Sequence, residues 1–303
     1  MTPFRANGVT LMAAMFWGLG NVMQKTVLDR LDGFAVTGIT AIIGAVVVAP
    51  FAVKEARQCL PALKGSLGLL VKASVLFSMA ATLMQFGYGQ TSVTNAGFLV
   101  NTAAVITPVV VWVFFGERQP LWLWGASLCA LAGVFLMAGG RWAGFSFGDL
   151  LCLAAALCFA VWTVAVGLYV TRYRRPVLLT IVQLAVCGIL CLGLGSLTYG
   201  MPTTAALAAA LPEIIFLGVI SKGLAYVLIA VAQQHVSATG VSILVSAEAV
   251  FGAALASVFL GETLGPVRAA GAFCIITGVI IASTLQPAAP ASDRLSQGPQ
   301  RRP

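Results

Sequence analysis

The sequence predicts an all-helical, polytopic membrane protein with ten transmembrane helices, arranged as two inverted five-helix repeats. Apolar residues make up 60% of the 303 residues and charged residues only 9%, whereas about a quarter of the residues in a soluble domain are charged. Apolar runs of about 20 residues, long enough to cross a bilayer as helices, follow one another along the chain. Sequence markers also recur at one constant spacing, which indicates a duplicated half.

The ten apolar runs are separated by mostly very short connections, which leave no room for a sizeable soluble domain. The first run follows Arg5 and has no small-residue cleavage site after it, so we interpret it as a retained span and not as a signal peptide. Residues 285–303 are rich in Pro, Ala, Ser, Gln and Arg, a composition that predicts a disordered cytoplasmic tail. In chain order, the predicted spans are 8–26, 34–53, 67–88, 92–115, 119–138, 148–170, 177–199, 212–233, 237–260 and 265–284.

The basic residues predict the orientation, because cytoplasmic loops retain Lys and Arg. With a cytoplasmic N-terminus, eleven basic residues face the cytoplasm and four face outside, so both termini are predicted to lie inside. The inner set is Arg5, Lys54, Arg57, Lys64, Arg118, Arg172, Arg174, Arg175, Arg294, Arg301 and Arg302. The outer set is Lys25, Arg30, Arg141 and Arg268.

An offset of 145 residues relates the two predicted halves, residues 1–143 and 144–284. Each half contains five spans, an odd number, so the halves insert with opposite orientation, as in many transporters built from inverted repeats. The matching pairs are Trp17 and Trp162, Ser92 and Ser237, Thr94 and Thr239, Leu99 and Leu244, Phe114 and Phe259, Gly116-Glu117 and Gly261-Glu262, and Gly133 and Gly278.

Two segments carry a family resemblance: Trp17-Gly18 followed by Lys25, and the segment with Thr94, Ala96-Gly97-Phe98-Leu99, Pro108 and Gly116-Glu117-Arg118. With the two halves, they resemble the EamA-type members of the drug/metabolite transporter superfamily over nearly the whole chain except the tail. Within that superfamily the chain is most similar to bacterial exporters of aromatic amino acids, the YddG type. The second half departs from the motif, with Ala253 at the position of Pro108 and Thr263 at the position of Arg118.

The resemblance implies a basket-like bundle in the bacterial inner membrane, with a central cavity lined by the first, third and fourth helices of each half. It also implies export of small metabolites. Polar and aromatic stripes on the spans give the candidate residues of the cavity, since a lipid-facing surface gains nothing from polar groups. We expect substrate binding by Trp17, Asn21, Gln85, Tyr88, Thr94, Phe98, Asn101, Trp162, Lys222, Tyr226 and Ser246.

Three residues are candidates for gating or coupling. Lys25 occupies the motif position, Pro108 interrupts the hydrogen-bond ladder of its span, and Glu248 lies near the bilayer midplane, eleven residues into its span. Lys222 lies ten residues into the preceding span, so the two charges are close enough in depth to form a structural ion pair. The alternative is that Glu248 takes part directly in proton or substrate chemistry. The helical wheel predicts that Glu248 points away from the face of Ser246.

Several function classes are excluded or disfavoured. The net charge of +8 is explained by membrane topology, so no nucleic-acid partner is expected. Seven cysteines without a CxxC pair and a single histidine give no support for a metal or cofactor site. No phosphate-binding GxxxxGK[ST] loop occurs, so ATP is not the direct energy source. An intramembrane enzyme is a remote alternative, because clustered catalytic groups are missing from the sequence.

The leading hypothesis is a secondary transporter that exports small amphipathic metabolites, above all aromatic and some neutral amino acids, by alternating access. The alternative is a broad drug or metabolite exporter with the same cavity. The expected partners are the small-molecule substrate and the lipid bilayer, and the expected state is a monomer or weak homodimer. Proton coupling, through Glu248 or through His235 near the inner face, is open beside facilitated diffusion.

Overall fold

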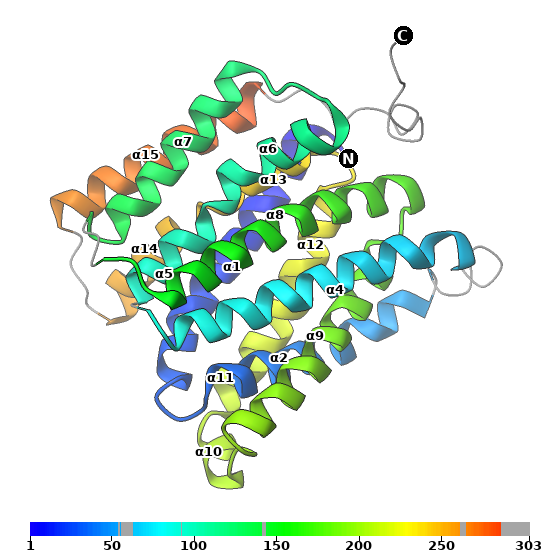
Figure 1. Cartoon of the computed structure of the whole chain (residues 1–303), viewed down its shortest axis with the longest axis vertical. Coiled ribbons are helices and arrows are strands. Elements are labelled where there is room, and N and C mark those ends of the chain that lie inside the picture. The colour runs from blue at the N-terminus through cyan, green and yellow to red at the C-terminus, as the bar shows by residue number, and fades with distance from the viewer. Residues whose placement is uncertain (54, 56–62, 92, 141–143, 261–264, 286–303) are drawn as a thin grey trace.

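Every regular element in the described part of the chain is a helix (Figure 1). The computed structural model describes residues 1–53, 55, 63–91, 93–140, 144–260 and 265–285, with the backbone alone at 63, 64, 93, 94, 259 and 260. The first part of the chain forms α1 (Pro3–Val27), α2 (Gly33–Val48) with the 3-10 turn η1 (Ala49–Ala52), α4 (Leu63–Tyr88), α5 (Val93–Asn101), α6 (Ala103–Phe115) and α7 (Leu121–Met137).

The second part begins at α8 (Phe147–Tyr173), whose start is fixed by a reciprocal capping box between Ser146 and Asp149. One short helix, α10, lies in a connection for which the sequence predicted no element. The helices that follow α8 are α9 (Pro176–Thr198), α10 (Thr204–Ala209), α11 (Leu211–Phe216), the π-helix η2 (Leu217–Leu224), α12 (Ala225–Ala232), α13 (Ala238–Val245), α14 (Glu248–Leu260) and α15 (Pro266–Leu285).

Eight helical stretches among the described residues are long and apolar enough to cross a membrane, and α7 is a shorter apolar helix. These nine match nine of the predicted spans. The first predicted span, α1, has 25 residues but is the most polar of the long helices, since it carries Asn7, Thr10, Asn21, Gln24 and Lys25. The multi-pass membrane architecture is therefore established, whereas the count of ten spans stays a prediction.

Helix α1 runs through the middle of the bundle and packs against α14, α13, α12 and η2 (Figure 1). Helices α2, α4, α8 and α9 form one side of the molecule, and α7 and α15 lie side by side as a pair on the other. The N-terminus lies at the same end of the bundle as the start of α4 and the end of α8. The central position of α1 explains how a comparatively polar helix is accommodated.

Two of the predicted spans are interrupted near their middles. The fourth span breaks at Thr102, whose hydroxyl donates to the carbonyl oxygen of Leu99 at 2.5 Å. The ninth span breaks at Ser246 and Ala247, and the Ser246 hydroxyl donates to the carbonyl oxygen of Ile243, also at 2.5 Å. Such local bonds compete with the helical ladder. Pro108, the predicted gating residue of this span, lies inside α6, downstream of the break.

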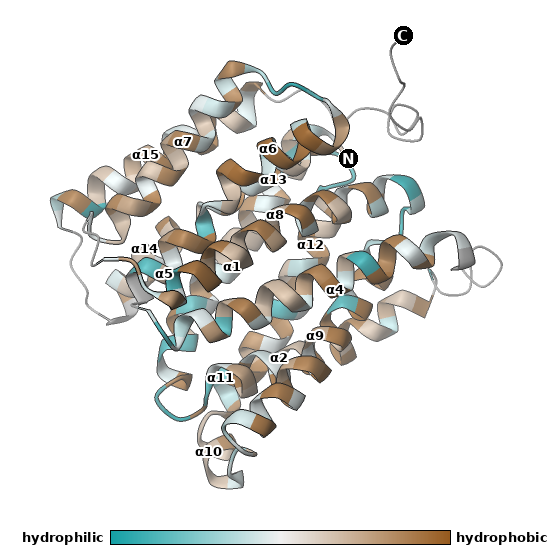
Figure 2. Ribbon diagram, in the orientation of Figure 1, coloured by the Kyte–Doolittle hydropathy of each residue, from teal (hydrophilic) through white to brown (hydrophobic). Residues whose placement is uncertain are grey.

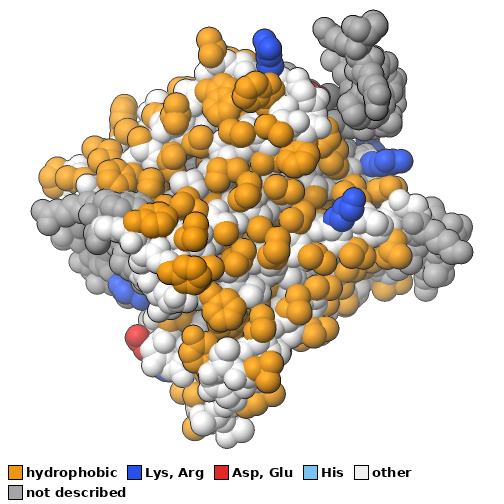
Figure 3. Space-filling view, viewed as in Figure 1, with side chains coloured by type: hydrophobic (Ala, Val, Ile, Leu, Met, Phe, Trp, Pro, Cys, Tyr) orange, Lys and Arg blue, Asp and Glu red, His pale blue; other side chains and the backbone are white. Residues whose placement is uncertain are grey.

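The surface agrees with a membrane environment. Figure 2 shows apolar residues along most of the helices, with hydrophilic residues in the connections, at helix ends and at a few places within helices such as α4. In the space-filling view, the face toward the viewer is dominated by hydrophobic side chains, whereas Lys and Arg lie toward its edges (Figure 3). Exposed residues such as Phe114, Leu128 and Phe273 belong to this apolar surface, which fits lipid contact.

Candidate functional site

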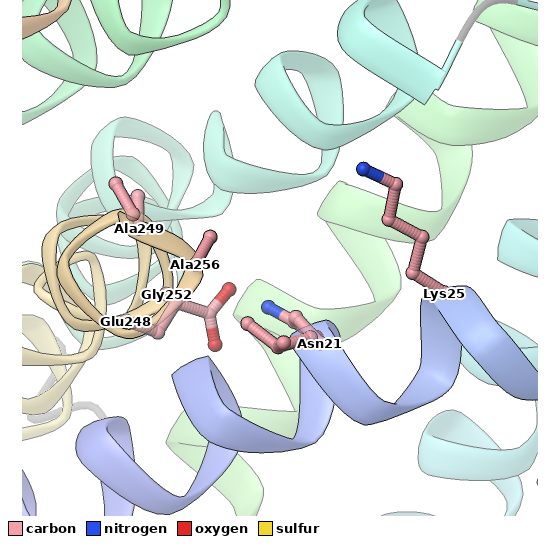
Figure 4. Close-up of a pocket in the computed structure, with 8 residues that line it drawn as sticks. Asn21, Lys25, Glu248, Ala249, Gly252 and Ala256 are labelled. Carbon is pink, nitrogen blue, oxygen red and sulfur yellow. The ribbon is translucent and has the colours of Figure 1, made fainter. Parts of the chain in front are cut away.

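A cavity of about 270 Å³ is bordered by α1 and α14 (Figure 4). Three of the sequence candidates line it: Asn21 and Lys25 from α1, and Glu248 from the start of α14. Figure 4 shows the Glu248 carboxylate and the Asn21 amide pointing toward one another, with Lys25 one turn further along α1. The cavity therefore combines an acidic, a basic and an amide side chain with small apolar residues.

The position of Glu248 follows from the interruption of the ninth span. Glu248 is the first residue of α14, directly after the two residues that break the helix. Its carboxylate lies close to the side chain of Asn101, which ends α5 at the interruption of the fourth span and donates to the carbonyl oxygen of Gly97 at 2.9 Å. The expectation that Glu248 points away from the polar face is therefore wrong, because the helical wheel assumed one continuous helix through Ser246.

Two tyrosines lie close to this carboxylate. The hydroxyl groups of Tyr88, at the end of α4, and Tyr226, in α12, are both within electrostatic range of Glu248. Five predicted site residues from different helices, namely Asn21, Lys25, Tyr88, Asn101 and Tyr226, thus gather around Glu248. The two tyrosines are outside the cavity lining, which contains no aromatic residue among the described side chains.

Helix α1 is held in place by hydrogen bonds to the π-helix η2. The Trp17 indole Nε1 donates to the carbonyl oxygen of Ser221 at 2.8 Å, and the Ser221 hydroxyl donates to the carbonyl oxygen of Phe16 at 3.1 Å. Close approach is allowed by Gly20, where a Cβ would collide with Ser221 Oγ. A π-helix is uncommon and is found frequently at functional sites. Trp17 therefore positions the cavity wall and does not line the cavity.

The predicted neighbourhood of Lys222 is corrected in one respect. Among the described residues, Lys222 makes no ion pair with Glu248. Its Nζ lies 5.7 Å from the centroid of the Tyr226 ring, and it is within electrostatic range of Cys187 and Cys191 of α9. Tyr226 is within electrostatic range of Glu248 as well as beside Lys222. In this structure the described side chains of Lys222 and Glu248 therefore do not form the ion pair that was one of the alternatives for Glu248.

Four further candidates make contacts away from the cavity. The Gln85 amide donates to Thr37 Oγ1 of α2 at 2.8 Å, and the Trp162 indole donates to Gln183 Oε1 of α9 at 2.9 Å. Phe98 stacks edge-on against Phe135 with 5.2 Å between ring centroids, and Ser246 bonds only locally at the helix break. Gln85, Trp162 and Phe98 therefore pack helices together. The side chain of Thr94 lies outside the described residues.

Five residues of the cavity lining were missed by the sequence interpretation: Val22, Ala249, Gly252, Ala253 and Ala256. The spacing of small residues after Glu248 was visible in the sequence, but it was not specific for a cavity. Gly252 and Ala256 follow Glu248 at spacings of four and eight residues, so they share its helix face. Small residues at such spacings are common at helix contacts in membranes, which is why they did not indicate a cavity.

Two titratable groups outside the spans have shifted pKa values. Burial lowers the pKa of His235 below its ordinary value, with smaller contributions from the N-terminal amino group and Arg174. His235 is therefore neutral at neutral pH, which weakens its candidacy as a coupling group. Burial raises the pKa of Glu55, although the backbone N–H groups of Leu178 and Val177 and the charge of Arg175 oppose this shift.

The described residues contain no group of three or more His, Cys, Asp and Glu side chains placed to hold a metal ion. Within the same residues, the groups near Glu248 are amides, phenols and an amine, which suit polar and ionic contacts with a small molecule. The arrangement can therefore bind opposite charges on one ligand, with Lys25 and Glu248 as the two ionic groups.

Comparison with known proteins agrees with this picture. A protein described as an uncharacterized transporter from Archaeoglobus fulgidus is 26% identical over 276 residues, which cover 90% of this chain and 83% of that protein. A protein of the same description from Methanothermobacter thermautotrophicus is 25% identical, with 89% of this chain and 84% of the relative covered. A solved crystal structure superimposes with a TM-score of 0.78 at 18% identity, covering 97% of this chain and 99% of that one, and so shares its fold.

The model of the EamA-like transporter family matches the chain twice, at residues 5–139 and 146–284. The two matches together span most of the sequence. The resemblance to EamA-type proteins stated from the motifs is thus confirmed at the level of the family. The chain belongs to the EamA-like transporter family and is a multi-pass membrane transporter.

Proposed function

We propose that this transporter exports small amphipathic metabolites, above all aromatic and some neutral amino acids, from bacterial cells. The observation that carries the proposal is the cavity between α1 and α14, which places Lys25, Asn21 and Glu248 around one space. A free amino acid is a zwitterion, with a carboxylate and an ammonium group on the same carbon. The Lys25 ammonium fits the carboxylate, and the Glu248 carboxylate fits the ammonium group.

The remaining lining suits the side chain of such a substrate. Gly252, Ala253 and Ala256 leave room beside the charged end of the cavity and present apolar surface. A volume of about 270 Å³ is near the lower end of the usual range for small-molecule sites, roughly 300–1,000 Å³. The tyrosines that adjoin Glu248, Tyr88 and Tyr226, can contribute hydroxyl groups in a more open conformation.

Alternating access of two inverted five-helix halves, with ten spans in total, is the proposed mechanism. Its support is the pairing of features 145 residues apart. A Cβ on Gly133 would collide with the carbonyl oxygen of Gly271, and a Cβ on Gly278 with that of Ala126. Gly133 corresponds to Gly278 and Ala126 corresponds to Gly271 under this offset, so the two contacts are equivalent in the two halves. The helix breaks at Thr102 and Ala247 are related by the same offset.

The proposed location is the inner membrane, with both termini in the cytoplasm. This orientation is supported by the basic residues Arg172, Arg174 and Arg175, which lie at the end of α8. That end of the bundle also carries the N-terminus (Figure 1). Positive residues are retained on the cytoplasmic side of bacterial membranes. Tagging either terminus and probing its accessibility in sealed inverted vesicles tests the orientation.

The function is tested by efflux from proteoliposomes loaded with labelled phenylalanine or threonine, with and without a pH gradient. We expect both amino acids to leave faster than from protein-free vesicles. Phenylethylamine, which lacks the carboxylate, and phenylpropionate, which lacks the ammonium group, should be exported much more slowly than phenylalanine. If neither amino acid leaves faster than from empty vesicles, the assignment of amino acids is wrong.

A broad drug or metabolite exporter is the second candidate. It is favoured by one observation, namely that the described cavity lining contains no aromatic side chain to select aromatic substrates. Cationic dyes would then use Glu248 alone. Competition between dyes and phenylalanine in the same vesicles separates the candidates, because a zwitterion-selective site predicts little inhibition by a dye without a carboxylate.

A further inference from the structure

A second polar cluster lies apart from the cavity, between α9, α4 and η2. Cys187 and Cys191 are one turn apart on α9, and both are essentially inaccessible, with 1% and 0% of their surfaces exposed. Their sulfur atoms are 3.9 Å apart, and Thr82 Oγ1 of α4 lies 4.0 Å from the Cys191 sulfur. The Lys222 ammonium is within electrostatic range of both sulfurs. The export proposal makes no use of these thiols.

The geometry of the pair disfavours a disulfide. A disulfide requires Cβ atoms about 3.5–4.5 Å apart, whereas residues one helical turn apart hold their Cβ atoms at about 5–6 Å. The separation of 3.9 Å between the sulfurs is that of a hydrogen bond between the thiols, and it also suits a bridging atom in a three-coordinate site. Two metal–sulfur bonds of about 2.3 Å, the length known for zinc, that meet at a trigonal angle place the sulfurs about 4.0 Å apart.

Charge then selects the kind of metal. Lys222 introduces a positive charge near the bilayer midplane, where an uncompensated charge costs several kcal/mol, and within the described chain no carboxylate forms an ion pair with it. A monovalent cation M⁺ that replaces both thiol protons forms an anionic [M(SR)₂]⁻ unit and releases two protons to solvent. The unit and Lys222 then sum to zero. A divalent cation in the same place leaves the net charge at +1.

We propose that Cys187 and Cys191, with Lys222 as the compensating charge, form a binding site for a soft monovalent cation such as Cu(I) or Ag(I). Thiolates prefer soft metals of this kind. Thr82 Oγ1 is placed beside Cys191 as a weaker third donor. The site is independent of the proposed export function, because neither thiol belongs to the cavity between α1 and α14.

The test is a Cu(I) titration of the purified full-length protein in detergent, under a non-thiol reductant, against a chromogenic Cu(I) chelator. We expect tight binding of one Cu(I) that weakens at least tenfold in both Cys187→Ser and Cys191→Ser. The matched control is Cys129→Ser/Cys274→Ser, a change of two thiols on the neighbouring helices α7 and α15, which should leave this binding intact. Equal loss in the control, or unchanged binding in both single variants, overturns the proposal.

Two further measurements keep the proposal testable if a serine variant fails to fold. In the unmodified protein, bound Ag(I) should protect Cys187 and Cys191, but not Cys158, from an alkylating reagent added as the protein unfolds in denaturant, as read by mass spectrometry of peptides. Lys222→Met removes the positive charge, so the two thiolates are neutralised by a divalent ion and no longer by a monovalent ion. Its affinity for Cu(I) should therefore fall at least tenfold relative to its affinity for Zn(II). No selective protection, or an unchanged preference for Cu(I) in Lys222→Met, contradicts the proposed site.

Discussion

Glu248 and Lys222 carry opposite charges at similar depths in consecutive spans, yet their surroundings differ. Glu248 starts a half-helix, lies close to the side chain of Asn101 and borders a cavity. Lys222 lies inside an unbroken π-helical segment, against the Tyr226 ring and two buried thiols. The charge at the helix break, Glu248, borders a cavity that a small molecule can enter and leave. The charge inside the continuous helix, Lys222, contacts side chains of the protein itself.

The strongest way to break the comparison is Glu248→Gln. If Glu248 binds the substrate ammonium, loss of its charge removes a charge-assisted contact of about 1.5–3 kcal/mol, which corresponds to a roughly tenfold to 100-fold fall in amino acid efflux. Efflux from proteoliposomes, normalised to inserted protein, measures it. The matched control is Glu213→Gln, which alters a surface pair with Arg30 at 3.7 Å and should leave efflux unchanged. Full activity of Glu248→Gln would remove Glu248 from the site.

Gly18→Ala tests the wall on which the cavity depends. A Cβ at Gly18 would lie 2.7 Å from both the Glu248 carbonyl oxygen and the Gly252 backbone nitrogen, so α1 and α14 must separate. Overpacking of this kind costs about 1–3 kcal/mol. Gly8→Ala, on the same helix, meets no atom within 4 Å and should be neutral or slightly stabilising. Thermal unfolding in detergent compares the two, and equal behaviour would contradict the tight contact.

Trp17→Phe tests the contact between α1 and η2, the π-helix that carries Lys222. The change keeps an aromatic ring but removes the donor to the Ser221 carbonyl oxygen, at a cost of about 0.5–1.5 kcal/mol. Trp162→Phe, which loses the bond to Gln183, is the matched variant. We expect similar losses of stability but reduced efflux only in Trp17→Phe. Reduced efflux in both variants would mean that neither bond has a special role.

Sequence patterns predicted the spans well and the site in part, for identifiable reasons. A bilayer imposes one length on every span, so apolar runs locate helices such as α9 within a residue or two. The breaks at Thr102 and Ser246 were invisible, because both runs remain apolar through them. Extrapolating 100° per residue across such a break rotates everything beyond it, which misplaced Glu248. Asn21 and Lys25, predicted as a binding and a coupling residue, lie on the continuous helix α1 and line one cavity.

The smallest expected effect is at Glu55, a charge outside the spans that resembles neither Glu248 nor Lys222. Its carboxylate accepts hydrogen bonds from the backbone N–H groups of Leu178, at 2.9 Å, and Val177, at 3.5 Å, in the first turn of α9. Glu55→Ala removes this cap, and loss of a helix cap costs about 0.5–2 kcal/mol. Glu55→Gln keeps an acceptor oxygen and should cost less.

The dependence on pH separates the two variants. Because burial raises the folded-state pKa of Glu55, its contribution to stability is complete below the ordinary glutamate range and declines as the pH rises through the folded-state pKa. Glu55→Gln cannot ionise. The unfolding temperature of this variant should therefore rise relative to that of the unmodified protein as the pH goes from acidic to neutral. Glu55→Ala should also lose this dependence but remain less stable than Glu55→Gln at each pH. A constant difference between Glu55→Gln and the unmodified protein would show that Glu55 ionises as it does in water.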